Sequence, residues 1–355
     1  MGFKKEFENL LATTTLSSES SMDEAVVVWG QINSLLLPNI PQQLFRFRTC
    51  SADSIMSFQT QTISTCVPNA FKDKYDSLVF VDKKSIETKL RELTIPEALI
   101  GLVQNEEICN SFEKVVGKES VEQVRNEALQ SPKEWLAKVR DNIERLVGYT
   151  LSSIDANVDY MRKDRFCKIA CFSEDVKSLR MWDTYADGYR GFALEYDFRE
   201  FHNVGSLACP NNSTCQNERR NFSHLFPVVY TDRRYDATDN VISLVQRDIL
   251  QKMGRNEYPP IDQLFWYKPY LYKNAEYYAH EKEWRMISRC PASTSSDYTE
   301  ISDLKTLRAI YYGPNMEKRH KDFLRSVAGN MKLREYDVSV DPYSPDFELK
   351  VVPCQ

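Results

Sequence analysis

Glycine is scarce in this chain, with 11 residues in 355, and histidine is scarcer still, with four. Neither a Gly-x-x-x-x-Gly-Lys loop nor a Gly-x-Gly-x-x-Gly fingerprint is present, so the two familiar glycine-built phosphate cradles are excluded. None of the four histidines falls within a recognisable nucleophile motif. The sequence therefore gives no support for a P-loop enzyme, a Rossmann domain or a histidine-based triad.

Long apolar runs are also missing, and so is an excess of basic charge. No stretch approaches the roughly 20 apolar residues that cross a bilayer, and the first residues lead into a polar Thr/Ser run rather than a signal-peptide core. The formal net charge is −5, whereas a general binder of nucleic-acid backbones is normally basic. We therefore expect a cytoplasmic protein without a membrane partner and give general backbone binding a low weight, while a local basic cleft stays open.

The nine cysteines follow no framework spacing, and their number is odd. In a chain of this length without a secretion signal, they are typical of reduced thiols. One stretch, with His202, Cys209, Cys215 and His224, could in principle supply zinc ligands, but its gaps fit no Cys-x2-Cys knuckle. We expect no metal site.

Hydrophobic residues make up 42% of the chain, which is enough for a sizeable core. Residues 1–40 are interpreted as an accessory N-terminal segment containing a helix, and residues 41–355 as a single α+β domain. Strands with interleaved helices, without a βαβ rhythm, favour a mixed or antiparallel central sheet over a doubly wound one. Strands are predicted at 44–48, 62–66, 168–172, 192–196, 228–230, 283–287, 307–312 and 348–352, and helices at 239–253 and 316–329.

A block at about 84–165 has helical character and is interpreted as a large insertion between strands. Apolar residues recur there at helical spacing. The pattern Thr94-x-x-Glu97 predicts a capping box, and Pro132 suits the first position of a further helix. We expect no chemistry from this block.

Two arginines stand two residues apart in the predicted strand 44–48. Side chains alternate between the faces of a strand, so Arg46 and Arg48 are predicted on one face and Phe45 and Phe47 on the other. Two guanidinium groups on one face form a fork for a carboxylate or a phosphate. The same pattern is also typical of an edge strand with a solvated basic face.

A second candidate segment runs from the end of the strand 168–172 into a predicted helix. Ser173 can cap that helix with its hydroxyl. Trp182 and Tyr185, three residues apart, share one side of the helix and could form an aromatic wall. The structural alternative is an ordinary N-cap followed by core aromatics.

The third candidate segment is acidic. On a strand, Glu281, Glu283 and Arg285 would share one face, with Trp284 and Met286 packed behind. Two carboxylates about 7 Å apart on a partly enclosed face raise each other's pKa, which suits acid/base work. An exposed strand carrying a Glu–Arg pair would have the same sequence.

These segments together resemble a large bacterial family known only as domain of unknown function 2971, over about 44–352. Its pieces here, in chain order, are Leu44–Arg48, Pro68–Asp73, Ala170–Glu174, Met181–Phe192, Val229-Tyr230, Lys273, Glu281–Arg285 and Ile310–Pro314. The chain departs from the family at Lys72, where Asn is usual, and at Tyr277 or Tyr278, where Trp is common. The family carries no established activity.

A more distant similarity supplies a functional hypothesis. ADP-ribosyltransferases present, in chain order, an arginine on a first strand, a serine at a strand end and a Glu-x-Glu on a later strand. Here Arg46 or Arg48, then Ser173, then Glu281-x-Glu283 follow that order, with Ser64 as a rival for the serine.

The resemblance implies roles for these residues. An arginine would hold the phosphates of NAD, and the serine would brace the ribose or the carboxylate. Glu283 would hold a ribose hydroxyl and stabilise the oxocarbenium-like transition state, and Glu281 would activate the acceptor. Trp182 or Tyr185 would stack on nicotinamide.

The leading hypothesis is therefore an NAD-using ADP-ribosyltransferase-like enzyme that modifies an unknown macromolecular acceptor, with a toxin or defence effector as the candidate role. The rival is a non-catalytic binding or regulatory module in which the arginine face and the acidic strand pair with each other. A phosphodiester-cleaving enzyme is the weakest option, because the acidic residues do not gather into a metal cluster.

Overall fold

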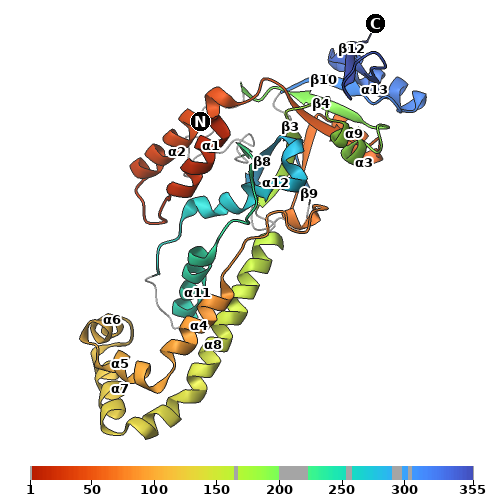
Figure 1. The fold of residues 1–355 in the computed structure, drawn as a ribbon. Helices are drawn as coiled ribbons and strands as arrows, with labels where there is room; N and C mark the ends of the chain where they lie inside the picture. Colours follow the sequence, from red (N-terminus) through yellow and green to blue (C-terminus); the bar gives the residue numbers. More distant parts are fainter. Residues whose placement is uncertain are drawn as a thin grey trace. The chain divides into compact units, whose positions relative to one another are not determined.

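The computed structural model describes residues 2–163, 167–199, 223–252, 258–289, 298–302 and 306–354 (Figure 1). Helices and strands are interleaved along the chain, and the protein has the predicted α+β class with a mixed central sheet. Among the described residues, no helix combines the length and the apolar character needed to cross a membrane.

The chain divides into two compact units. One, the sheet unit, comprises Met1–Leu78, Arg162–Tyr235 and Asp262–Gln355, and the other, the helical unit, comprises Val79–Met161 and Asp236–Ile261. The predicted division into an accessory segment and one domain stays a prediction.

The sheet unit contains the described strands. They are β1 Leu44–Arg48, β2 Thr62–Cys66, β3 Cys167–Ser173, β4 Phe192–Tyr196, β5 Ser223–Pro227, β6 Val229–Thr231, β7 Tyr272–Asn274, β8 Glu283–Arg289, β9 Tyr298–Ser302, β10 Leu307–Tyr312, β11 Arg334–Val340 and β12 Leu349–Pro353. The main sheet follows the order β12-β11-β10-β4-β1-β3-β2-β9, with β8 on β3 and β5 on β8, while β6 and β7 form a separate parallel pair. Within the main sheet β10 and β11 are parallel, and the other pairs are antiparallel.

Strand β3 is where this sheet splits. Strand β8 pairs with it along its whole length, from Cys167 to Ser173, and so occupies one edge. Strand β1 pairs with β3 only at Ser173, and β2 pairs with it only at Ile169. Because a strand has two edges, β1 and β2 share the remaining edge and diverge from it.

Alternating side chains explain why these segments form strands with two covered faces. Leu194, Trp284 and Ile310 belong to one apolar cluster, which also takes in Leu324 from α13 (Lys318–Met331). On the other face Phe45 and neighbouring strand residues pack against α9 (Leu179–Tyr185). The predicted strands and the helix at 316–329 are confirmed, with ends shifted by a few residues.

The N-terminal helices pack on the sheet unit. They are α1 Phe3–Thr13 and α2 Met22–Leu36. In α1 the Phe3 ring stacks on Trp284 at 5.9 Å, and Phe7 stacks on Phe226 at 6.2 Å. The sequence indicated α2 but missed α1, whose apolar residues sit within a highly charged segment.

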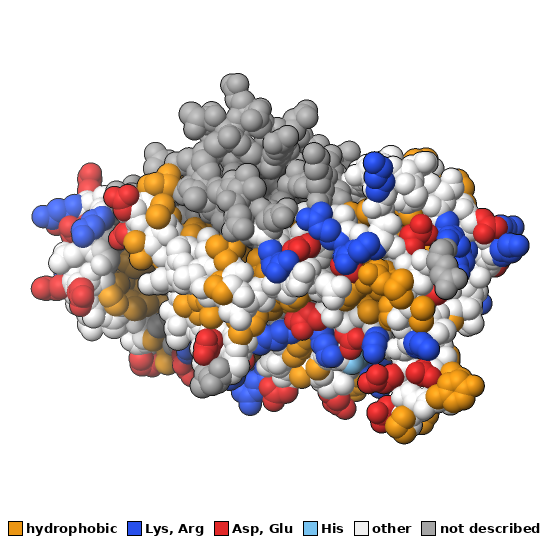
Figure 2. All heavy atoms as spheres, turned by 90° about the horizontal axis from the view of Figure 1, so that it is seen from above, with side chains coloured by type: hydrophobic (Ala, Val, Ile, Leu, Met, Phe, Trp, Pro, Cys, Tyr) orange, Lys and Arg blue, Asp and Glu red, His pale blue; other side chains and the backbone are white. Residues whose placement is uncertain are grey.

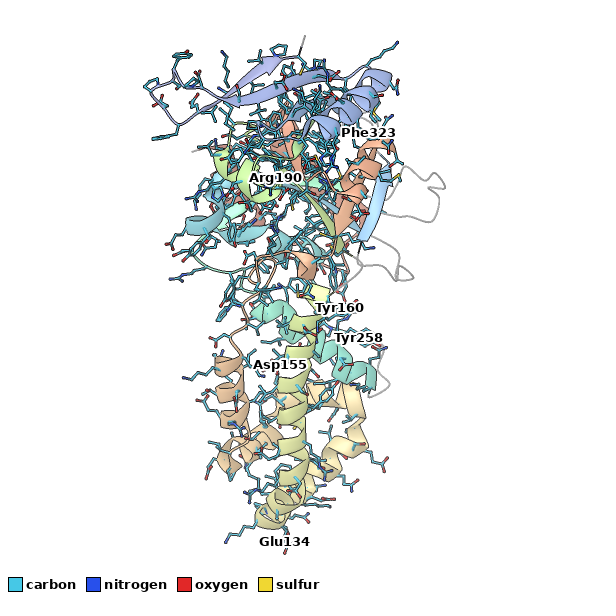
Figure 3. All side chains as sticks on the ribbon, turned by 90° about the vertical axis from the view of Figure 1, so that its right-hand side faces the viewer. Glu134, Asp155, Tyr160, Arg190, Tyr258 and Phe323 are labelled. Atoms are coloured by element: carbon cyan, nitrogen blue, oxygen red, sulfur yellow. The ribbon has the colours of Figure 1, made fainter. Side chains whose placement is uncertain are left out.

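The helical unit contains α4 Lys83–Leu93, α5 Pro96–Gln104, α6 Glu106–Val116, α7 Lys118–Gln130, α11 Thr238–Lys252 and α8 Pro132–Lys163 without its last two residues. Figure 3 shows Glu134, Asp155 and Tyr160 in this order along α8. The capping box predicted at Thr94 is wrong: Thr94 ends α4 and donates its hydroxyl to the Arg91 carbonyl, and Pro96 begins α5.

Charges of both signs are mixed over the described surface. Figure 2 shows Lys and Arg side chains interspersed with Asp and Glu on the face seen from above. This mixture accords with the small net charge of −5.

Gly313 provides a test of the packing between β4, β10 and the turn before β4. A Cβ at Gly313 would lie 2.2 Å from the Tyr189 carbonyl oxygen, whereas one at Gly329, within α13, would meet nothing within 4 Å. We predict that Gly313→Ala lowers the free energy of unfolding by about 2 kcal/mol or more, because backbone must move. Gly329→Ala should raise it by about 0.5–1 kcal/mol. Denaturant unfolding measures both, and equal effects of the two substitutions would contradict the packing described.

Candidate functional site

A cavity of about 420 Å³ opens where β1 and β2 diverge from β3. Its lining includes Arg46 and Arg48 from β1, Tyr185 from α9, and the acidic pair Glu281 and Glu283. Five of the seven predicted site residues therefore meet around one hollow, although they come from distant parts of the chain.

The two arginines of β1 lie half-buried on the cavity wall. Arg46 donates to the backbone carbonyl and to the hydroxyl of Ser64, and its guanidinium lies 5.8 Å from the centroid of the Phe172 ring. Burial lowers the pKa of Arg46, and burial together with the charge of Arg46 lowers the pKa of Arg48 to about 10. Within the described chain neither guanidinium forms an ion pair with a carboxylate, so the wall carries cationic charge available to an anion.

The acidic pair is arranged differently from the prediction. Strand β8 begins at Glu283, and Glu281 ends the short 3-10 turn before it, so the two residues do not share a strand face. Lys282 between them adopts a left-handed conformation, with φ 46° and ψ 49°. This turn brings both carboxylates onto Lys273, whose ammonium lies 2.5 Å from Glu281 Oε2 and 3.0 Å from Glu283 Oε2.

Arg285 closes a buried network around Glu283. Its Nε donates to Glu283 Oε1 at 2.8 Å, and its two terminal nitrogens donate to the carboxylate of Asp76 at 2.8 and 2.5 Å. Three carboxylates and two cations, all at most 8% exposed, thus form one network: Asp76, Glu281, Glu283, Lys273 and Arg285. Carboxylates outnumber cations by one, so the network carries a net negative charge when all five groups are ionised.

The two glutamates have opposite pKa shifts. Burial raises the pKa of Glu281 above its ordinary 4.5, and the nearby charge of Lys273 only partly offsets this. Burial acts in the same direction on Glu283, but Arg285 and Lys273 outweigh it and hold the pKa of Glu283 below 4.5. Glu283 is therefore a fixed anion, while Glu281 is the more basic carboxylate.

Tyr185 lines the cavity as predicted for an aromatic wall, and its hydroxyl donates to Glu281 Oε1 at 2.7 Å. Burial, followed by the charge of Glu281, raises the pKa of this phenol. Trp182 does not line the cavity. It is fully buried against Phe47, with ring centroids 5.2 Å apart, and its indole N–H donates to the Val176 carbonyl.

Ser173 also lies outside the cavity lining. It does not cap the next helix, which begins at Leu179 after the capping residue Ser178. The Ser173 hydroxyl is fully buried, donates to the Glu281 carbonyl at 2.7 Å and accepts from the Asp175 N–H. It therefore holds the chain that carries Glu281. The rival Ser64 lines an adjoining cavity of about 630 Å³ that also contains Arg46 and Arg48.

Three members of the buried network, Asp76, Lys273 and Arg285, were not among the predicted site residues. The sequence marks Lys273 only through the family resemblance, and Arg285 through that resemblance and through its position two residues after Glu283. Asp76 gave no signal in the sequence, because it is one acidic residue in a polar loop. No group of three or more His, Cys, Asp or Glu in the described ranges could hold a metal ion. His202, Cys209 and Cys215 lie outside the described residues, as does the side chain of His224.

Comparison with known proteins gives one match. Residues 181–286 match the family described as "Protein of unknown function (DUF2971)". The matched segment includes Tyr185, Lys273, the acidic pair and Arg285, whereas Arg46 and Asp76 lie before it. No curated protein and no solved structure matches the chain.

Glu283→Gln tests the energetic role of the network. We predict a loss of about 3–5 kcal/mol in the free energy of unfolding at neutral pH, because Arg285 and Lys273 lose a buried anionic partner. The folded-state pKa of Glu283 is lowered, so its contribution is present above pH 4.5 and is lost as the pH falls through the folded value. The difference between wild type and variant should therefore shrink in acid.

Urea unfolding at several pH values measures this difference. The matched control is Glu348→Gln, whose partner Lys177 lies 3.5 Å away on the surface and for which we expect less than about 0.5 kcal/mol. Equal effects of the two substitutions, or a Glu283→Gln effect that grows in acid, would refute the assignment.

Proposed function

We propose that this site binds NAD, cleaves the bond between nicotinamide and ribose, and transfers ADP-ribose to an acceptor. The observation that carries the proposal is that Arg46 and Arg48, which have no carboxylate partner among the described residues, face the same cavity as Glu281 and Glu283. A dinucleotide has two matching parts, an anionic pyrophosphate and a ribose that becomes cationic during cleavage.

The arginine end of the site suits a pyrophosphate. Guanidinium groups present planar arrays of donors that match phosphate oxygens, and a half-buried cation gains free energy when an anion arrives. Lys72 lines both cavities, and the adjoining cavity adds Thr49, Ser51 and Ser64, which carry hydroxyl groups. Cavities of about 420 and 630 Å³ fall within the range usual for small-molecule sites.

The acidic end suits the ribosyl group. As the bond from the anomeric carbon breaks, nicotinamide leaves with the bonding electron pair, and positive charge develops on the ribose. The net negative charge of the network would stabilise this charge, and Lys273 and Arg285 hold Glu283 in place before it forms.

Glu281 supplies the acid–base function in this scheme. Each of its two oxygens accepts one hydrogen bond, from Tyr185 and from Lys273, so lone pairs remain for a ligand hydroxyl or an incoming nucleophile. Its raised pKa makes it the better base of the pair. Glu281 would take the proton that the acceptor loses.

A second candidate is a non-catalytic module that holds an anionic ligand at Arg46 and Arg48. One observation favours it: the charge of Glu283 is already matched by Lys273 and Arg285, which is also what a purely structural network requires. The pairing expected between the strand arginines and the acidic segment is replaced, in the described chain, by these two cations.

Arg48→Met tests the phosphate-binding role. Loss of a charged hydrogen bond should weaken NAD binding by about tenfold or more. We expect the melting temperature of the free protein to stay the same or to rise, because one of two neighbouring cations is removed. Isothermal titration calorimetry with NAD measures the affinity, and Arg190→Met, which removes an exposed arginine paired with Asp187, is the control. An unchanged affinity of Arg48→Met for NAD would contradict the phosphate-binding role of Arg48.

Glu281→Gln separates catalysis from binding. The raised pKa of Glu281 means that its ionised form is disfavoured in the folded protein, so the neutral amide should be tolerated better than at position 283. We predict that nicotinamide release falls by about a hundredfold or more while NAD affinity changes little. Chromatographic detection of nicotinamide measures the rate. NAD binding without release in wild type would favour the non-catalytic module.

A further inference from the structure

A third cavity adjoins the site cavity at Lys273, the cation that pairs with both glutamates. It measures about 520 Å³ and shares Asp73, Lys273 and Tyr278 with the site cavity. The cavity that contains Ser64 instead shares Arg46, Arg48 and Tyr185 with the site cavity. The site cavity, whose lining includes the acidic pair, therefore borders two others. One is the arginine-lined cavity that contains Ser64, and the other is the third cavity.

Tyrosine dominates the lining of this third cavity, which we call the tyrosine cleft. Five tyrosines line it: Tyr75, Tyr235, Tyr272, Tyr277 and Tyr278. The exposed fractions of Tyr75 and Tyr277 are 67% and 63%, so both rings are open to a ligand. The rings of Tyr235 and Tyr272 lie 5.2 Å apart. Among the described residues, Leu78 and Pro269 supply the aliphatic lining.

We propose that the tyrosine cleft holds an unpaired nucleobase of a single-stranded nucleic acid, and that this base is the acceptor of ADP-ribose. The acceptor role rests on the proposed NAD-dependent function. Aromatic faces bind flat rings, and every base has such a face. A duplex would keep its bases stacked, whereas a single strand can insert one.

The polar groups of the cleft favour a base over an apolar peptide side chain. Arg233 and Arg234 lie at its rim, where they can contact phosphates, and the Arg234 guanidinium lies 5.9 Å from the centroid of the Tyr75 ring. The carboxylates of Asp73 and Asp232 can accept hydrogen bonds from N–H groups of a base. Aromatic rings rather than aliphatic groups make up most of the apolar lining that the described residues give the cleft, so a flat ring fits it better than an aliphatic side chain.

Lys273 lies between the tyrosine cleft and the proposed acid–base residue Glu281. Its ammonium lies 2.5 Å from Glu281 and 4.4 Å from the centroid of the Tyr278 ring, and its side chain lines both cavities. Glu281 lines the site cavity and not the cleft, so a base held in the cleft would have to present a nitrogen past Lys273 toward Glu281. In the transfer, a lone pair of that nitrogen forms a bond to the anomeric carbon as nicotinamide leaves with its electron pair, and the displaced proton passes to Glu281.

Fluorescence anisotropy with labelled oligonucleotides tests the cleft. The probes are a short single-stranded DNA, the matching single-stranded RNA, the DNA duplex and the free mononucleotides. We expect wild type to bind a single strand more tightly than the duplex, and Tyr75→Ala/Tyr277→Ala to weaken that binding by about tenfold or more. The DNA, RNA and mononucleotide arms show which source of the base is recognised.

The matched control is Tyr343→Ala, because Tyr343 is 94% exposed in the same unit and lines none of the three cavities described here. NAD affinity, measured separately, should be equal in wild type, the double variant and the control.

Unaltered strand binding in the double variant, a preference for the duplex, or no binding of any probe would overturn the inference. None of these outcomes changes the NAD result, so failure here is distinguishable from failure of the proposed function. Transfer of label from NAD to the strand should also require Tyr75 and Tyr277.

Discussion

The ion network around Lys273 and Arg285 is the interaction on which the candidate site depends. Taking a charge out of water costs several kcal/mol, and the cost is recovered only when partners with good geometry surround it. Here Arg285 bridges Asp76 and Glu283, and Lys273 bridges Glu283 and Glu281. Glu283 is the carboxylate that both cations share, so its removal leaves each of them with one buried partner fewer.

This network also joins parts of the chain that the sheet alone would not hold together. Asp76 belongs to a loop after β2, Lys273 to the small sheet of β6 and β7, and Glu283 to the main sheet. Ser173 adds a hydrogen bond from the end of β3 to the Glu281 carbonyl. The left-handed residue Lys282 is a strained conformation of order 1–3 kcal/mol, which the surrounding contacts maintain.

The divergence of β1 and β2 from β3 creates the cavity beside the ion network. If β1 followed the whole length of β3, Arg46 would be one more residue on a covered strand. As β1 leaves β3 after a single pair, Arg46 spans the gap to Ser64 and the cavity opens between the strands. A cationic wall and an anionic network thus face one another without neutralising each other.

Local patterns in the sequence determined the elements and the chemical types at the site. Alternation placed β1, β3 and β8, and the types of Arg46, Glu281 and Glu283 indicated an anion-binding and an acid–base function. Only the tertiary structure decided the partners: Lys282 turns the chain out of the strand, Asp76 arrives from a loop, and Ser173 and Trp182 serve packing instead of lining the cavity. The alternation of apolar and polar residues along a strand shows which face of the sheet each side chain lies on. It does not show which distant segments of the chain meet, and ion pairs depend on that.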